Sequence, residues 1–381
     1  MPSLLIEDLD HVFEKTRPLW AEMQDGHLFL AGGSGFFGKW LIETFLSANR
    51  RLGLNARVTV LARNPDRLQA ELPHLVSGDE LTFLQGDVRS FPLEPEVYTH
   101  MIHAASDATM PVTPETADEL IDVIVNGTRR LLSYASATGV KKFLYCSSGA
   151  VYGPQQFTAP VMSEDSYFGP PSASFGSAYA EGKRVAESLC CAEAARTGLE
   201  VKIARPFAFI GPYLPLDAHF AAGNFIRDVL MGRPINLTGD GTPVRSYLYA
   251  ADLAVWLWTI LFEGQSARPY NVGSEHKMTV ADLARLTARF SKPPLKVTLG
   301  PSSPDSRFKT NRYVPATERA RRELGLIDSF SLFDSIDRTL RFYRQPAEAT
   351  PLLESSKWQT STSATLRSEM ADLATSSLKS A

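Results

Sequence analysis

Residues 27–38, HLFLAGGSGFFG, decide the fold of this 381-residue chain. The stretch begins as a short apolar run typical of a buried strand, and Gly32, Gly35 and Gly38 then recur at every third position. The residues that follow, KWLIETFLSANRRLG, have the periodicity of an amphipathic helix. Glycines between a strand and a helix permit a tight turn, in which backbone N–H groups at the helix N-terminus face a diphosphate. The stretch therefore predicts the phosphate-binding loop of a dinucleotide-binding domain.

Apolar runs alternate with helical stretches through the first half of the chain. This alternation predicts a parallel sheet with helices on both faces, joined by right-handed crossovers. The fold class is therefore α/β, a Rossmann-type doubly wound parallel sheet with a smaller C-terminal substrate-binding lobe. The expected strands are residues 27–31, 57–62, 81–85, 100–105, 141–148 and 199–211.

Changes in amino-acid composition along the chain divide it into parts. Past about residue 212, Pro and Gly become frequent, and the last residues are rich in Ser and Thr with little apolar periodicity, which is typical of a mobile tail. The expected parts are an N-terminal helical extension (1–25), the Rossmann domain with elements returning from the C-terminal part (26–212), the substrate-binding lobe (213–345) and a flexible tail (346–381).

Composition and charge exclude several classes of protein. The net charge of −3 comes from interspersed acids and bases, without a block of like charge that could follow a nucleic-acid backbone. The three cysteines have neither a disulfide pattern nor a metal-binding spacing. The N-terminus lacks the order of a signal peptide, and the longest apolar run, 254–262, is far below the ~20 residues that span a bilayer. We therefore expect a cytoplasmic protein with no nucleic acid, membrane or metal partner.

Two polar residues follow the second and third predicted strands. Arg63 stands where an acid commonly binds the ribose 2′-hydroxyl of NAD, and a guanidinium instead suits a 2′-phosphate. The cofactor is therefore NAD or NADP, with NADP slightly favoured, unless Arg63 is only a solvated loop residue. Asp87 is suitably placed to accept a hydrogen bond from the adenine amine, and the alternative is a turn cap.

A serine, a tyrosine and a lysine form the candidate catalytic set. Tyr179 and Lys183 are four residues apart, hence on one face of a predicted helix. Lys183, together with a positively charged nicotinamide ring, should lower the pKa of Tyr179 from its ordinary value of ~10, so that the phenol acts as general base or acid. Ser148 ends a predicted strand at the edge of the sheet where ligands bind, and its hydroxyl can share the substrate oxygen. The alternative is a surface tyrosine beside a lysine.

These motifs together resemble one family. The runs AGGSGFFG, GDVR, IHAAS, SSGAVYG, YAEGK, ARPFAFIGP and YNVGS, spread over residues 27–325, resemble the extended short-chain dehydrogenase/reductases of the nucleotide-sugar epimerase and dehydratase branch. The resemblance implies a nicotinamide cofactor and a nucleoside-diphosphate sugar that is oxidised or reduced at C4. It assigns to cofactor binding Gly32, Ser34, Gly35, Phe36, Phe37, Gly38, Arg63, Asp87, Val88, Ala104, Ala105, Tyr179, Lys183 and Pro206.

The resemblance also assigns substrate contacts and a dimer. Asn224, Arg245 and Arg312 match positions that bind the diphosphate, although each arginine could be a surface residue. Two helices, at about 117–137 and 177–195, form the dimer contact in the family, so we expect a homodimer, with burial inside the monomer as the alternative. Asp252 is interpreted as a helix cap rather than a catalytic residue. Apolar residues on the first helix are Leu120, Ile121, Ile124, Leu131 and Leu132.

Departures from the family pattern narrow the activity. Where 4,6-dehydratases resembling this chain have an acid pair, Gly149 and Ala150 stand here, and the nucleotide-sugar decarboxylases usually have a glutamate in place of Ala150. A 4-epimerase or an NADPH-dependent 4-ketoreductase needs only hydride transfer and one general acid or base. Tyr179 provides that acid or base. The hypotheses are therefore a 4-epimerase first, a 4-ketoreductase second, a dehydratase or decarboxylase less favoured, and, from another class, a dinucleotide-binding sensor or scaffold.

Overall fold

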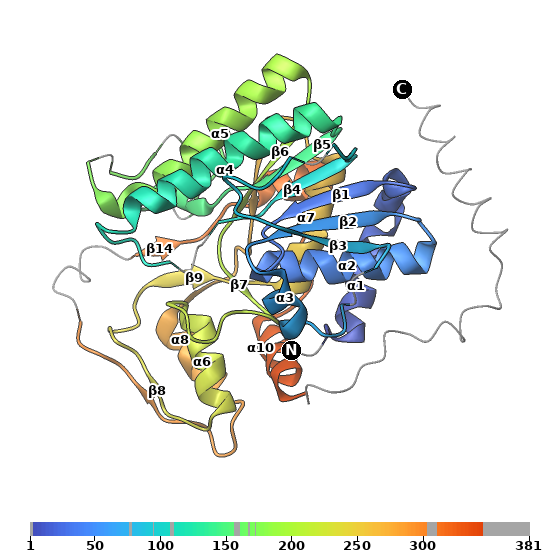
Figure 1. The fold of residues 1–381 in the computed structure, drawn as a ribbon. Coiled ribbons are helices and arrows are strands. Elements are labelled where there is room, and N and C mark those ends of the chain that lie inside the picture. The colour runs from blue at the N-terminus through green and yellow to red at the C-terminus, as the bar shows by residue number, and fades with distance from the viewer. Residues whose placement is uncertain are drawn as a thin grey trace, which may run out of the picture.

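Seven parallel strands form the central sheet, in the order β11–β6–β5–β4–β1–β2–β3 (Figure 1). The computed structural model describes residues 3–75, 78–93, 95–106, 110–155, 161–166, 168–171, 173–302 and 311–345, so the predicted tail lies outside the described residues. Each of the six predicted strand regions contributes a strand to this sheet. The strands are β1 (His27–Ala31), β2 (Arg57–Ala62), β3 (Leu81–Gln85), β4 (His100–His103), β5 (Lys142–Cys146), β6 (Glu200–Pro206) and β11 (Pro269–Val272).

Helices cover both faces of the sheet, which confirms the predicted α/β class (Figure 1). The side chains of β1 alternate between two cores: Leu28 and Leu30 pack with one set of helices, Phe29 and Ala31 with the other. Strands that are buried on both faces read as continuous apolar runs, which is why the sequence marks them clearly. The first set of helices is α1 (Ile6–Thr16), α2 (Phe36–Leu52), α3 (Pro65–Glu71) and α7 (Ala250–Glu263), and the second is α4 (Ala117–Thr138) and α5 (Ala178–Thr197).

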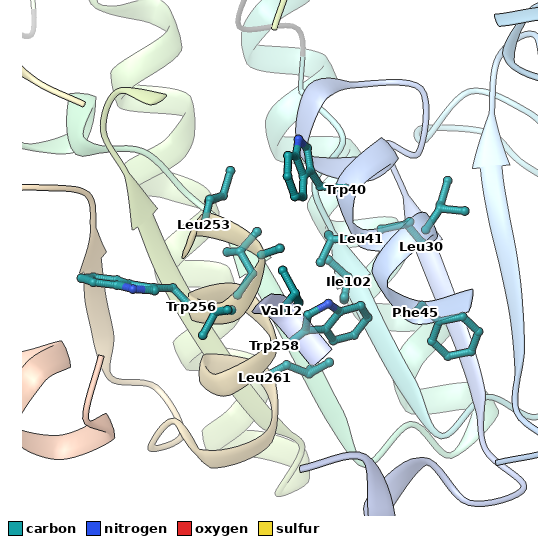
Figure 2. Close-up of a cluster of buried hydrophobic side chains, with 14 of the residues drawn as sticks. Val12, Leu30, Trp40, Leu41, Phe45, Ile102, Leu253, Trp256, Trp258 and Leu261 are labelled. Atoms are coloured by element: carbon teal, nitrogen blue, oxygen red, sulfur yellow. The ribbon is translucent and has the colours of Figure 1, made fainter. Parts of the chain in front are cut away.

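Helix α7 contains the longest apolar run and lies inside the protein. All of its residues except the last are buried, and Trp258 belongs to the same apolar cluster as Trp40 of α2 and Val12 of α1 (Figure 2). The prediction of a buried helix is confirmed. Within the described residues, no helix is long and apolar enough to cross a membrane.

The N-terminal segment docks on α7 and on the C-terminal helix α10 (Leu332–Arg344). It consists of α1 and the 3-10 helix η1 (Arg17–Met23). Asp8 of α1 is buried and accepts hydrogen bonds from the hydroxyl of Tyr249 at 2.6 Å and from Nη1 of Arg338 at 2.6 Å. Such a buried carboxylate needs both donors, because an unpaired charge in a low-dielectric interior is costly.

Asp252 has a different role from the predicted one. The N-cap of α7 is Tyr249, and no side chain of the described residues caps this helix. Asp252 instead joins the N-terminal segment to a C-terminal loop: its Oδ1 lies 3.0 Å from Nε2 of His11, and its Oδ2 accepts from the backbone N–H of Ser329 at 2.7 Å. The helix-cap interpretation is therefore wrong, because both carboxylate oxygens are used in tertiary contacts.

Apart from α9 (Glu318–Leu324), which packs against β11 and α7, the remaining helices and short strands form a lobe beside the carboxyl ends of the central strands (Figure 1). The helices α6 (Ala221–Leu230), α8 (Val280–Ala288) and α10 enclose a separate apolar core. The chain returns from this lobe to the central sheet through α7 and β11. The other elements are β7 (Phe209–Ile210), β8 (Ile235–Asn236), β9 (Val244–Ser246), β10 (Leu248–Tyr249), β12 (Lys277–Thr279), β13 (Val297–Thr298) and β14 (Arg312–Tyr313).

Candidate active site

The loop between β1 and α2 has the geometry that a diphosphate requires. Gly32 has a φ of +97°, and a Cβ there would lie 2.5 Å from the carbonyl carbon of Ala104; a Cβ at Gly38 would lie 2.3 Å from the oxygen of Gly32. Gly35 is the N-cap of α2, and no side chain of the described residues caps this helix. Ser34 and Gly35 are exposed, so the N–H groups of the first helical turn remain accessible to an anion. The loop therefore fits the diphosphate of a dinucleotide.

Aromatic and apolar side chains hold this loop from behind. Phe36 and Phe37 open α2 half-buried, and the ring of Phe37 packs edge-on against Phe209, with 5.3 Å between centroids. Gly33 was not singled out in the sequence, although a Cβ there would lie 2.2 Å from Cγ1 of Val60. The three-residue spacing identifies the other three glycines of the loop, whereas only the packing of β2 against the loop explains Gly33.

The ends of β2 and β3 hold two arginines around one aspartate. Arg63 is exposed directly after β2, and its charge contributes to lowering the pKa of Asp87. The larger cause is Arg89, whose Nε and Nη2 donate to the two carboxylate oxygens at 2.8 Å each and hold the pKa of Asp87 at about 2. Arg89 also donates to Asp122 of α4 at 2.8 Å. Asp87 is therefore fixed as a carboxylate, and its contact with an adenine amine stays a prediction.

The other predicted cofactor contacts lie near the carboxyl ends of the strands. The backbone N–H of Ala104 donates to Ala31 of β1 at 2.9 Å, and the half-buried Ala105 follows it. Pro206 ends β6. The side chain of Val88 packs against Gly127 of α4, and a Cβ added to Gly127 would lie 2.7 Å from Cγ1 of Val88. Its side chain therefore belongs to the core.

Ser148 is the second residue after the end of β5 and is buried. Its Oγ accepts a hydrogen bond from the backbone N–H of Ala150 at 3.1 Å and so caps the 3-10 helix η2 (Gly149–Tyr152). A hydroxyl has one proton and two lone pairs, so the proton of Ser148 remains for another acceptor. Ser148 lies close enough to Tyr179 to lower the pKa of its phenol, so two members of the predicted catalytic set come together.

Tyr179 and Lys183 lie one turn apart on α5. Lys183 is 1% exposed, its Nζ donates to the carbonyl oxygen of Cys146 at 2.7 Å, and it lies 5.8 Å from the centroid of the Tyr179 ring. Burial lowers the pKa of Lys183 to about 8. Burial also raises the pKa of Tyr179, and hydrogen bonds with Ser148 and Ser106 lower it by less. The predicted lowering of the tyrosine pKa is therefore not produced by the protein's own side chains, because desolvation of the phenolate outweighs them.

A buried ion pair supports the catalytic helix. Glu187 of α5 accepts from Nε and Nη2 of Arg205 at 2.9 and 2.6 Å, and from the hydroxyl of Ser147 at 2.5 Å. Arg205 also donates to the hydroxyl of Tyr152 at 2.8 Å. This network ties α5 to the ends of β5 and β6, and so fixes the height of Lys183, one helical turn earlier, relative to the strand ends.

Sequence reasoning missed three side chains at the site. Ser106 lies three residues after the end of β4 and lowers the pKa of Tyr179. A Cβ placed on Gly149 would lie 2.7 Å from the hydroxyl oxygen of Tyr313 and 2.8 Å from the ring of Phe207. The signal for Ser106 was its place after a strand. Nothing local marks Tyr313, because it reaches the site only through the return of the chain.

The predicted substrate residues are distributed over the C-terminal lobe. Asn224 is half-buried on α6. Arg245 of β9 is level with Tyr313 of the neighbouring β14, and burial lowers its pKa. Arg312 is level with Val244. Because side chains alternate along a strand, Arg245 and Arg312 leave this small sheet on opposite faces, and their contact with a diphosphate stays a prediction.

The fold and the site define a dinucleotide-binding domain with a serine, tyrosine and lysine at the strand ends. A model of the NAD dependent epimerase/dehydratase family matches residues 28–273. The chain belongs to this family of NAD(P)-dependent enzymes that act on nucleotide sugars, and the resemblance seen in the sequence is confirmed.

Relatives and solved structures agree with this assignment. UDP-glucuronic acid decarboxylase 1 of Arabidopsis thaliana is 28% identical over 319 residues, which cover 83% of this chain and 69% of that protein. UDP-glucose 4-epimerase of Thermotoga maritima, solved with UDP-glucose, is similar with a TM-score of 0.68 and 20% identity, covering 84% of this chain and 98% of its own. dTDP-glucose 4,6-dehydratase of Streptomyces venezuelae, solved with NAD bound, has a TM-score of 0.68 and 24% identity, covering 84% of this chain and 97% of its own. These two structures support the fold alone.

Proposed function

We propose that this protein catalyses NAD(P)-dependent oxidoreduction at C4 of a nucleoside-diphosphate sugar, with 4-epimerisation as the first candidate. The observation that supports the proposal is the meeting of Ser148, Tyr179 and the buried Lys183 at the strand ends, beside a loop that fits a diphosphate. This set can hold one sugar hydroxyl and move one proton, which is all that hydride transfer at a carbinol carbon demands.

The side chains have separate tasks in this proposal. The β1–α2 loop and Arg63 would hold the dinucleotide, whose nicotinamide supplies the hydride acceptor or donor. Tyr179 would exchange a proton with the sugar oxygen, and Ser148 would direct its hydroxyl proton to that same oxygen while Tyr179 is protonated. Lys183, anchored on the carbonyl of Cys146 at 2.7 Å, would provide a positive charge that favours the phenolate.

A 4-ketoreductase is the second candidate, and two observations favour it. The pKa of Tyr179 is raised by burial, so the phenol carries a proton to donate at neutral pH. Arg63 is exposed after β2, where a guanidinium suits the 2′-phosphate of NADPH. A reductase consumes and releases NADPH, whereas an epimerase retains and recycles its cofactor within one turnover.

Elimination or decarboxylation finds little support at this site. The positions after Ser148 are Gly149 and Ala150, neither of which can move a proton. Glu187 is engaged by Arg205 and Ser147, so it is not available as a base. Because a curated relative is a UDP-glucuronic acid decarboxylase, UDP-glucuronic acid nevertheless belongs among the substrates to be tested.

The assembly in this proposal is a homodimer formed through α4 and α5. Leu120, Ile124, Leu131 and Leu132 are buried within the protomer, in agreement with the monomer alternative for those four. Ile121 on α4 is 40% exposed, however, and Val185 on α5 is 45% exposed. Light scattering of the protein and of a variant with Glu at both exposed positions tests this, since a single-chain mass for the unmodified protein would remove the dimer.

The test of function begins with the cofactor. The purified protein is denatured, the released nucleotide is identified by mass spectrometry, and the emptied protein is titrated with NAD and NADP. It is then assayed with UDP-glucose, dTDP-glucose, UDP-glucuronic acid and 4-keto sugar nucleotides. Retained NAD with interconversion of C4 epimers supports the epimerase, and a preference for NADPH with reduction of a 4-keto sugar supports the reductase. Release of CO2 from UDP-glucuronic acid would contradict both candidates and indicate a decarboxylase.

A further inference from the structure

A second tyrosine, Tyr313, lies beside the catalytic serine and comes from a distant part of the chain. It is the last residue of β14 in the C-terminal lobe, whereas Ser148 and Tyr179 belong to the Rossmann part. A Cβ on Gly149, the residue after Ser148, would come within 2.7 Å of the Tyr313 hydroxyl. Any side chain at position 149 would therefore displace the phenol from Ser148.

The surroundings hold the Tyr313 ring in place. The centroid of the Tyr313 ring lies 4.6 Å from that of the Phe207 ring. This contact and the pairing of β14 with β9 hold the Tyr313 hydroxyl beside Ser148. The charged and titratable groups that face it are Arg245 from β9, Tyr179 from α5 and Tyr152 from η2. Burial raises the pKa of Tyr313 and outweighs the opposing effects of Ser148 and Arg245, so its proton is retained.

The hydroxyl groups lie in the order Ser106, Tyr179, Ser148 and Tyr313, so close that both serines lower the pKa of Tyr179 and Ser148 also lowers that of Tyr313. Four hydroxyls have four protons, and three hydrogen bonds between neighbours would use three of them. When Tyr179 gives its proton to the substrate oxygen, the three remaining protons can all point inward: Ser106 donates to Tyr179, and Tyr313 donates to Ser148, which donates to Tyr179. Each oxygen–oxygen contact is then satisfied, and the phenolate receives two donors.

We propose that Tyr313 is a positioning residue that donates to Ser148 and thereby directs the Ser148 proton onto the phenolate of Tyr179. The proposal deepens the proposed function, on which it rests, and no bond other than hydrogen bonds changes at Tyr313. A phenol is a stronger donor than water, and chains of hydrogen bonds in a low dielectric strengthen one another. The effect should therefore appear in proton transfer and spare nucleotide binding.

The experiment compares Tyr313→Phe with Tyr343→Phe, a matched control whose hydroxyl donates to the carbonyl of Leu214 at 2.6 Å in the C-terminal lobe. With the nucleotide sugar that the unmodified enzyme turns over, Tyr313→Phe should lower kcat about tenfold, keep KM within about twofold and move the rise of the oxidation rate to higher pH. The control should change none of these. Equal kcat and pH profiles for the two variants would overturn the proposal.

A double substitution decides whether Tyr313 acts through Ser148. If it does, Ser148→Ala together with Tyr313→Phe should be no slower than Ser148→Ala alone, because the intermediate hydroxyl is already missing. A further loss of about tenfold would show an independent action and would overturn the proposal.

A readout without substrate separates this proposal from the proposed function. Ultraviolet difference titration against Tyr179→Phe reports the ionisation of Tyr179, whose other neighbours are Ser106, Cys146 and Lys183. In the Tyr313→Phe background, Tyr179 should titrate at higher pH. An unchanged titration would overturn the positioning role even in a protein that acts on nucleotide sugars. Failure to turn over any nucleotide sugar would remove the proposed function on its own.

Discussion

Replacement of Lys183 by Met should change the stability of the protein in a way that depends on pH. Lys183 is 1% exposed, and burial lowers its pKa from 10.5 to about 8. This difference corresponds to about 3 kcal/mol of destabilisation of the folded protein while the lysine is charged. The cost is fully present below pH 8 and is relieved as the pH rises toward 10.5, because the unfolded chain then binds more protons than the folded one.

The comparison across pH isolates this effect from the lost hydrogen bond to Cys146. That bond contributes about 1 kcal/mol at any pH, whereas the titration of Lys183 should raise the stability of the unmodified protein relative to Lys183→Met by about 2 kcal/mol between about pH 7 and pH 9.5. The nearby acids do not titrate in this range, since burial raises the pKa of Cys146 to about 12 and that of Tyr179 above its ordinary value.

The assay is urea unfolding followed by tryptophan fluorescence at several pH values. Lys202→Met is the matched control, because Lys202 is also buried but its Nζ lies 2.5 Å from Oε2 of Glu200. Its loss removes an ion pair and should lower stability at pH 7. A difference between the unmodified protein and Lys183→Met that does not change with pH would refute the reasoning, because Lys183 would then not titrate in this range.

Three further substitutions test other parts of the site. Tyr179→Phe should reduce turnover by about 10²–10⁴-fold with dinucleotide binding unchanged, and retention of biological activity would instead indicate a scaffold. Gly38→Ala should weaken dinucleotide binding more than tenfold in a fluorescence titration, since the added Cβ would lie 2.3 Å from the oxygen of Gly32; normal affinity would argue against the loop. Glu187→Gln should lower stability by about 3 kcal/mol in thermal unfolding, because Arg205 loses its buried carboxylate partner, and an unchanged Tm would contradict that pairing.

The sequence by itself determined six of the seven strands of the central sheet, the phosphate loop and the catalytic helix. These features are local: a buried strand reads as an apolar run, a tight turn needs glycine, and residues four apart share one face of a helix. Gly32, Tyr179 and Lys183 could therefore be placed by their spacing, and Ser148 by its position at the end of a predicted strand. The same locality explains why the order of the motifs sufficed to indicate the family.

Only the tertiary structure decided which distant groups complete the site and how its charges behave. Tyr313 reaches Ser148 because β14 pairs with β9 far along the chain, and no local pattern encodes that pairing. Asp252 binds His11 and Ser329 instead of capping its helix. The predicted lowering of the Tyr179 pKa failed for a related reason: spacing gives the distance to Lys183, whereas desolvation depends on everything that packs around the phenol.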